Sequence, residues 1–223
     1  MTRQRTAKPR SQTRARSDEA KREVRQALID AGRELISHEG AVPVSLRQIA
    51  RHAQYSPGVV YRYFPDKAAL MQAIRDEALD SLADRIEGLL STDGDAREML
   101  LMIAEAGFRF ATEQSANFGM NILTMSWNRT TEVPDPFEAK MDLSSPGARI
   151  HQLYERAILR FIEQAGAKPP PLDMAVASFM ATITGSVALP GGSLHGALPE
   201  RTAVLQENIS MLMQKWEVAS LRG

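Results

Sequence analysis

The chain has 223 residues, 43% hydrophobic and 24% charged, which is typical of a soluble globular protein with one or two domains. The absence of cysteine excludes disulfides and thiolate metal sites, and no apolar run approaches the roughly 20 residues that would span a membrane. The net charge of zero hides a division, because residues 1–67 carry 14 Lys and Arg against 7 Asp and Glu, whereas residues 68–223 carry 13 against 20. A basic first third beside an acidic remainder predicts that a polyanion binds at one end.

Residues 1–17 form a strongly basic segment with six Lys and Arg and no acidic residue. A segment with so little apolar surface cannot fold alone, so we expect a disordered arm. Two interpretations of this arm stay open: a solvated leader, or an arm that follows DNA phosphates or enters a minor groove. The segment lacks the apolar stretch of a secretory signal, and we expect a cytoplasmic protein.

Three helices are predicted after the arm. The first covers residues 17–38, where apolar residues such as Leu28 and Leu35 recur on one face at a period of 3.6 residues. Two short helices follow in the run SLRQIARHAQYSPGVVYRYF, with Ser45 suited to cap one and Ser56 the other. Because a turn of about four residues separates them, they predict a helix-turn-helix, which lays its second helix in the DNA major groove.

The run YRYFPDKAAL, which starts at Tyr61 and includes Lys67, resembles the aromatic-rich signature of tetracycline-repressor (TetR) family regulators. Upstream, LIDAG and LISHEG resemble the family's first helix and its closing glycine, so that the resemblance covers residues 22–72. Two residues depart from the pattern: Gln54 stands where the turn usually has Gly, and Tyr55 where a small aliphatic residue is usual. A non-Gly residue at positive φ is unusual, so these departures bear on the geometry of the turn.

The resemblance implies that Tyr61 faces DNA and that Tyr63 and Lys67 reach phosphates. From the chemistry of the residues themselves, Ser45 at a helix start is suited to phosphate binding. Arg62 is suited either to guanine O6 and N7 or to a phosphate, and the sequence leaves that choice open. The complete set of predicted DNA-binding residues is Ser45, Arg47, Ser56, Pro57, Gly58, Val59, Tyr61, Arg62, Tyr63 and Lys67.

The rest of the chain continues in helical stripes and never alternates at period 2 for long, so we expect an all-α fold. A fourth, long helix capped by Asp66 should end near the turn at residues 91–94, and residues 128–147, which contain three prolines, should form a long loop. The expected domains are a basic arm over 1–17, a three-helix DNA-binding domain over 18–67, and a helical ligand-binding and dimerisation domain over 68–223.

The C-terminal domain is rich in methionine and aromatic residues, and Met adapts readily to irregular cavities and varied partners. The resemblance implies a small effector bound between its helices, and a four-helix dimer interface formed by its last two helices. Because few charges lie among the candidate wall residues, we expect a largely apolar effector. The predicted wall residues are Phe110, Phe118, Met125, Trp127, Phe137 and Phe179.

These features together lead us to interpret the chain as a ligand-responsive transcriptional repressor that binds a palindromic operator as a homodimer, with activation left open. The two helix-turn-helix units would meet major grooves about 34–36 Å apart. The alternative is a DNA-acting enzyme such as a recombinase, but we find no nucleophile or carboxylate cluster for it. We therefore expect no enzyme activity, no cofactor and no membrane partner. We also expect no metal site, since the four histidines lack the spacing of metal ligands.

Overall fold

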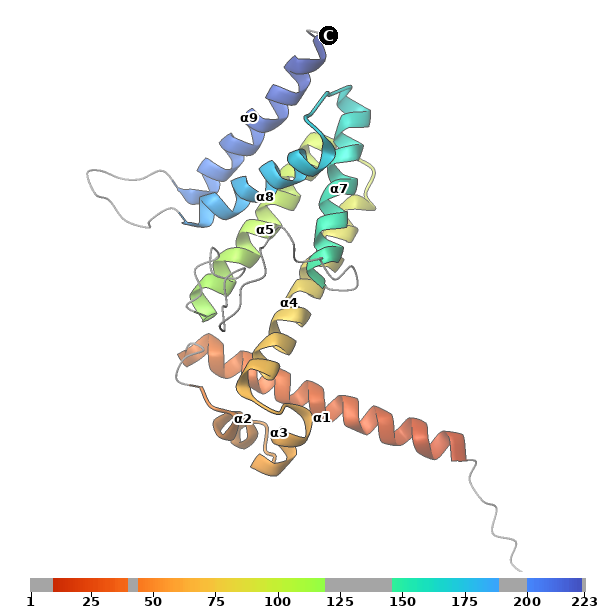
Figure 1. Cartoon of the computed structure of the whole chain (residues 1–223), viewed down its shortest axis with the longest axis vertical. Helices are drawn as coiled ribbons and strands as arrows, with labels where there is room; N and C mark the ends of the chain where they lie inside the picture. Colours follow the sequence, from red (N-terminus) through yellow and green to blue (C-terminus); the bar gives the residue numbers. More distant parts are fainter. Residues whose placement is uncertain (1–9, 40–43, 119–145, 189–199, 222–223) are drawn as a thin grey trace, which may run out of the picture. The chain divides into compact units, whose positions relative to one another are not determined.

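The computed structural model describes residues 10–39, 44–118, 146–188 and 200–221, and every regular element in these ranges is an α-helix. The prediction of an all-α fold is confirmed. None of the described helices is both long and apolar enough to cross a membrane. The helices, shown in Figure 1, are α1 (Arg10–Glu39), α2 (Leu46–His52), α3 (Pro57–Tyr63), α4 (Lys67–Leu90), α5 (Ala96–Phe118), α7 (Pro146–Ala165), α8 (Leu172–Ala188) and α9 (Arg201–Leu221).

Two compact units make up the chain, residues 1–75 and residues 76–223. The boundary falls inside α4, so this helix gives its first nine residues to the N-terminal unit and the rest to the C-terminal unit. The division expected from sequence, at residue 68, instead follows the end of the helix-turn-helix motif. Each unit is described below by itself.

The N-terminal unit is a small helical bundle in which α1 packs on α2 and α2 packs on α3. Gly32 in α1 permits close packing, because a Cβ atom there would lie 2.9 Å from the Cδ1 atom of Ile74. Apolar side chains from all four helices fill the centre of this unit. The most deeply buried are Leu28, Ile29, Ile36, Val44, Ile49, Ala50, Val60, Phe64, Leu70 and Ile74.

Helix α1 begins at Arg10 and not at residue 17, so the prediction of a disordered arm is wrong for residues 10–17. Residues 1–9 lie outside the described part of the chain. The segment from residue 10 to residue 20, RSQTRARSDEA, is rich in Arg, Gln and Ala, which have high helix propensity, and contains no Gly or Pro. Extending a helix that is already packed also avoids the costly nucleation step. Low apolar content therefore did not prevent this segment from being helical.

The N-cap residues of α2, α3 and α4 are the ones predicted from the sequence. Ser45 and Gln48 form a capping box at the start of α2: the Gln48 backbone N–H donates to Ser45 Oγ at 3.3 Å, and the Ser45 backbone N–H donates to Gln48 Oε1 at 2.9 Å. Ser56 is the N-cap of α3, although its side chain makes no capping hydrogen bond. Asp66 Oδ1 accepts a hydrogen bond of 2.8 Å from the backbone N–H three residues on, at the start of α4.

The turn between α2 and α3 contains Gln54 at a φ of 60°, which is the left-handed conformation that glycine adopts most easily. Of the described non-glycine residues, Gln54 alone has a positive φ. The departure from the family pattern at this position is therefore a change of residue and not a change of turn geometry.

We expect Gln54→Gly to stabilise the protein by about 0.5–1 kcal/mol. The left-handed conformation costs a side-chain-bearing residue about 1–2 kcal/mol, and the greater freedom of glycine in the unfolded chain offsets part of that gain. Urea denaturation measures the change. Gly166→Ala is the matched control, since Gly166 has a φ of 61° and open space where a Cβ would be added, so this variant should lose stability. A stability unchanged or reduced by Gln54→Gly would contradict the account.

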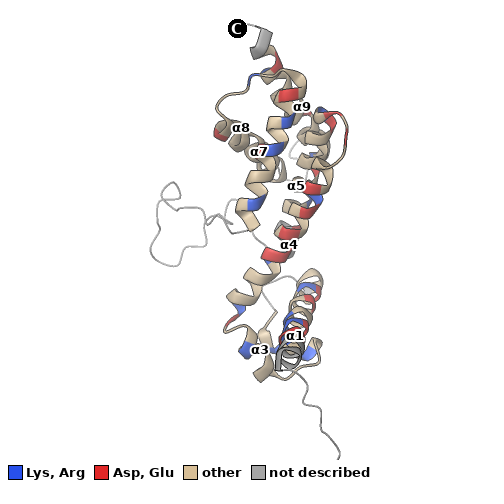
Figure 2. Cartoon of the chain, turned by 90° about the vertical axis from the view of Figure 1, so that its right-hand side faces the viewer, with Lys and Arg blue, Asp and Glu red and all other residues tan. Residues whose placement is uncertain are grey.

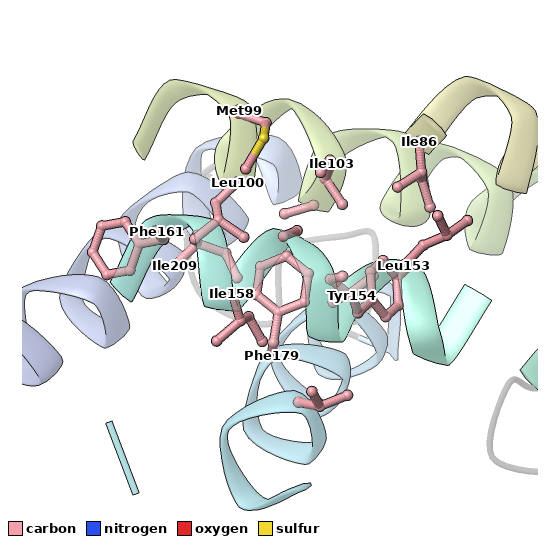
Figure 3. Close-up of a cluster of buried hydrophobic side chains, with 14 of the residues drawn as sticks. Ile86, Met99, Leu100, Ile103, Leu153, Tyr154, Ile158, Phe161, Phe179 and Ile209 are labelled. Atoms are coloured by element: carbon pink, nitrogen blue, oxygen red, sulfur yellow. The ribbon is translucent and has the colours of Figure 1, made fainter. Parts of the chain in front are cut away.

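The C-terminal unit is organised around α5, which packs against α7, α8 and α9. Figure 3 shows the buried side chains of these helices and of α4 meeting in one cluster. Within it, the ring of Tyr154 meets the ring of Phe179 edge to face at 5.3 Å, and the rings of Phe161 and Trp216 lie 6.2 Å apart. Its members include Ile86, Leu100, Ile103, Leu153, Tyr154, Ile158, Phe161, Phe179, Ile209 and Trp216.

Hydrogen bonds connect α7 to α4 within this unit. Near the start of α7, the Arg149 guanidinium donates to Asp84 at 2.7 Å and to Glu87 at 2.8 Å. These carboxylates raise the pKa of Arg149 further. Towards the end of α7, Arg160 donates to the carbonyl oxygen of Leu90, the last residue of α4, at 2.9 Å. Figure 2 shows the acidic residues along α4.

The long loop predicted over residues 128–147 lies almost wholly outside the described residues. Its last two members, Pro146 and Gly147, are helical and begin α7, so the prediction is wrong for them. Proline is well tolerated at the first position of a helix, because its missing N–H would have no partner within the helix there.

Candidate nucleic-acid interface

Helix α3 presents a polar face to solvent because its apolar residues are used for packing. Val60 is fully buried and Phe64, which follows the helix, is 3% exposed. These two residues are four apart and share one face, so Tyr61 and Arg62 between them turn outward. Tyr61 is 50% exposed and Arg62 is also exposed.

The other predicted residues of α3 lie around its first turn or along its edge. Ser56, Pro57 and Gly58 are exposed, whereas Val59 and Tyr63 are half-buried. Gly58 has open space around it, since a Cβ atom there would meet only Ser56 Oγ, at 4.0 Å. The first turn of α3 is therefore accessible to another molecule.

The starts of α2 and α4 supply the remaining predicted residues. Ser45 and Arg47 are exposed at the start of α2, and Lys67 is half-buried at the start of α4. The first N–H groups of a helix have no partners within the helix and favour anions. Hydroxyl, phenol, guanidinium and ammonium groups are the donors that contact DNA phosphates and base edges. All ten predicted DNA-binding residues thus belong to one small unit and at least part of each is accessible.

A contact between two side chains joins α2 to α1. His52 Nε2 lies 2.8 Å from Glu34 Oε2. The hydrogen bond from His52 and then its charge lower the pKa of Glu34. Because the pKa of Glu34 is lower in the folded unit than in the unfolded chain, this pair stabilises the unit at neutral pH, and the contribution is lost as the pH falls through the lowered pKa.

The predicted effector-binding residues are only partly described. Phe179 is buried beside Tyr154 in the core, and Phe110 is half-buried against the same cluster. Phe118 is the last residue of α5, and its side chain lies outside the described part. Met125, Trp127 and Phe137 also lie outside it. The grouping of these six residues into one wall stays a prediction.

Tyr154, which is not among the residues singled out from the sequence, places a polar atom in the middle of the apolar cluster. Burial raises the pKa of its phenol, and no described residue forms a hydrogen bond with its hydroxyl. The hydroxyl lies against Gly107 of α5, where an added Cβ atom would come within 2.7 Å of the oxygen. The stripe of α7 gives a signal that Tyr154 is buried, but only the packing of α5 and α7 pairs it with Gly107.

We expect the effect of Gly107→Ala to change sign with residue 154. In the parent chain the added methyl group meets the Tyr154 hydroxyl, and such overpacking costs about 1–3 kcal/mol. In a Tyr154→Phe background the clash with oxygen is gone, and alanine should be neutral or stabilising by up to about 1 kcal/mol because it favours a helix. A double-mutant cycle by urea denaturation measures this coupling. Equal costs in both backgrounds would show that the hydroxyl is not what opposes a side chain at position 107.

The outward faces of α8 and α9 form an apolar surface with a groove of about 460 Å³. Met211, which lines the groove, is 50% exposed. Small residues in α8 leave room for the groove, which is lined by Ala181, Thr182, Gly185, Ser186, Val204, Asn208, Met211, Leu212 and Lys215.

Comparison with known proteins agrees with the geometry of the N-terminal unit. The family model for bacterial regulatory proteins of the tetR family matches residues 28–74, from the first buried residue of α1 into α4. The regulator BetI of Escherichia coli strain UMN026 is 30% identical over 112 residues, which are 49% of this chain and 56% of BetI. Residues 28–74 therefore resemble the TetR family.

Further relatives and solved structures extend the comparison beyond these residues. BetI of Cronobacter sakazakii is 38% identical over 88 residues, or 43% of that protein, so the chain spans about half the length of the relatives it matches. A TetR/AcrR-family regulator from Thermobifida fusca has a TM-score of 0.62 at 16% identity, covering 86% of this chain and 97% of that one. FadR from Bacillus subtilis, solved in complex with stearoyl-CoA, has a TM-score of 0.61 at 17% identity, covering 84% and 97%. At these identities the structures show a shared fold.

Proposed function

We propose that this chain is a ligand-responsive transcriptional repressor of the TetR family, which binds a palindromic DNA operator as a homodimer and is released by a small, apolar effector. The observation that carries the proposal is the capped helix-turn-helix whose second helix exposes Tyr61 and Arg62 while Val60 is buried. The BetI relatives are named as transcriptional regulators, which supports regulation rather than enzymatic activity. Binding to chromosomal DNA would place the protein in the bacterial cytoplasm.

DNA recognition in this proposal divides between two kinds of contact. The first turn of α3 approaches base edges in the major groove, where Arg62 is suited to guanine and Val59 to a thymine methyl group. Ser45, Tyr63 and Lys67 contact phosphates on either side and fix the register of α3 without reading sequence.

Dimerisation is assigned to the exposed surface of α8 and α9. The large apolar side chain of Met211, which lines the groove, remains in solvent only at a cost, and Met is enriched at interfaces between proteins. The groove between the two helices offers a depression into which side chains of a second copy can insert. A two-fold dimer of this kind matches the two-fold symmetry of a palindromic operator.

The effector is assigned to the helical C-terminal unit. Phe110 and Phe179 belong to or border its apolar cluster, which supports an apolar ligand. The FadR structure with stearoyl-CoA shows that a protein of this fold accommodates a ligand with a long apolar chain. Arg149 of α7 forms hydrogen bonds with α4, and the backbone of α4 continues into the DNA-binding unit. A ligand that shifts α7 could therefore act on the DNA-binding unit through α4. Such coupling is typically worth about 1–3 kcal/mol.

Selection of bound duplexes from a random DNA pool tests the proposal directly. A ligand-responsive repressor should enrich one palindromic sequence whose half-sites are separated by about one helical turn. Enrichment of a single half-site without symmetry would contradict the homodimer, and no enrichment would contradict sequence-specific regulation.

A thermal-shift screen that compares fatty acyl compounds with small charged metabolites tests the effector class, since a ligand specific to the folded state raises its stability. Hits limited to the charged compounds would contradict an apolar effector.

A further inference from the structure

Helix α1 extends well beyond the core that it helps to build. Among the side chains of α1 that the structure describes, which begin at Asp18, the first buried one is Leu28, and between Asp18 and Gln26 only Val24 is half-buried. The part of the helix before Leu28 has 18 residues, or about 27 Å of helix, and Figure 1 shows it running past α2 and α3. Burial in this unit therefore does not explain why the chain has so long a helix here.

The register of α1 separates the charges of this extension by face. At about 100° per residue, positions 10, 14, 21 and 25 fall within about 60° of one another, and all four are Lys or Arg. Their mean direction coincides with that of Leu28 and Gly32, which face the core. We call these four positions, Arg10, Arg14, Lys21 and Arg25, the basic stripe.

Acidic residues lie mostly on the other side of the helix. Glu19 and Glu23 fall roughly opposite the basic stripe. Asp18 borders the stripe and lies 3.4 Å from Lys21, but both side chains are more than half exposed, so this pair is weak and screened by salt. The stripe thus keeps a positive potential along one side of α1.

One contact connects the basic stripe to the recognition helix. The guanidinium carbon of Arg25 lies 5.4 Å from the centre of the Phe64 ring, and Phe64 is the C-cap of α3. The stripe therefore has one end beside the end of α3 and continues from there along one face of α1. A polyanion that lies against the outer side of α3 and extends past it would meet this face.

We propose that the N-terminal half of α1 is a second DNA-contact element, whose basic stripe follows the phosphate backbone beyond the groove that α3 occupies. This inference rests on the proposed function, because it assigns a further contact to the same DNA. From position 10 to position 25 the stripe covers about 22 Å, a length over which duplex DNA presents several phosphates. A helix formed in advance also loses less conformational entropy on binding than a disordered arm would.

The test compares two triple variants that remove the same charge from different faces. The stripe variant is Arg10→Gln, Arg14→Gln and Lys21→Gln, and it keeps Arg25 because of its contact with Phe64. The control variant is Arg16→Gln, Arg22→Gln and Arg33→Gln, at positions that lie at least about 90° from the centre of the stripe. Glutamine preserves helix propensity, and circular dichroism checks that each variant stays folded.

The measurement is the affinity of each full-length protein for a selected operator duplex of about 30 base pairs, and for a random duplex, between about 50 and 200 mM salt. Each lost phosphate contact lowers the slope of log affinity against log salt by about 0.9, so the stripe variant should lose about 2.7 on both duplexes if all three residues make contacts. The control variant should keep the parent slope. The ratio of operator affinity to random-duplex affinity should stay the same, since phosphate contacts carry no sequence information.

Equal changes of slope in the two variants would overturn the proposal, because total charge and not the stripe would then be responsible. Unchanged slopes in both would overturn it as well and identify the stripe as a solvated surface. Both results would leave sequence-specific binding by the parent chain intact. Failure of the parent to prefer any DNA sequence would instead contradict the proposed function itself.

Discussion

A chain that carries both Ala181→Glu and Met211→Glu is expected to sediment as a monomer and to bind its operator about 100-fold more weakly or worse. Both residues line the groove and are exposed in the single chain, so the glutamates should not disturb its own core. In a two-fold dimer the same surface meets itself, which would bring four carboxylates into an apolar interface. A buried charge without a partner costs several kcal/mol, and a hundredfold loss in affinity corresponds to about 2.7 kcal/mol.

The matched control for this variant is Met102→Glu. Met102 is 51% exposed on α5, outside the groove between α8 and α9, so the same substitution there should leave both sedimentation and operator affinity unchanged. Thermal melting should show that all variants are folded. A dimer that persists in the double variant with normal operator affinity would place the interface on another surface of the chain.

Replacing Tyr61 with alanine should weaken operator binding by about 1–3 kcal/mol, or about 5- to 150-fold, with almost no change in melting temperature. The side chain is 50% exposed on the outer face of α3, so its loss removes little internal packing. Its phenol and ring are suited to contact with a phosphate or a base edge. A gel-shift titration on the selected operator gives the change in affinity, and calorimetry gives the melting temperature.

The neighbouring residue, Val60, provides a control that should lower stability without weakening DNA binding. Val60 is fully buried, so Val60→Ala should lower the free energy of unfolding by about 1–3 kcal/mol while the remaining folded protein binds its operator normally. If Tyr61→Ala lowered the melting temperature and left binding intact, Tyr61 would be part of the packing of the unit, and its assignment to DNA contact would be wrong.

The sequence alone was sufficient for the features that depend on neighbouring residues. Ser45 and Gln48 form the capping box, and Asp66 caps α4, because these interactions join positions three residues apart and need no distant partner. The all-α fold follows from the same locality, since the period of apolar residues along a helix is set by the backbone. The helical state of residues 10–17 is equally local, because helix propensity outweighs their low apolar content, which favoured a prediction of disorder.

Other features were decided only when the helices packed together. Helix α8 has apolar residues on several faces, so its sequence does not show that Phe179 turns into the core while Met180 stays exposed. The pairing of Tyr154 with Gly107, and that of Arg149 with Asp84, join residues 47 and 65 positions apart. Periodicity identifies a buried stripe but not its partner, because contacts at such separations depend on how the helices cross. The caps and the recognition motif were therefore determined by the sequence by itself, whereas the choice between core, groove and exposed surface in the C-terminal unit was made by tertiary packing.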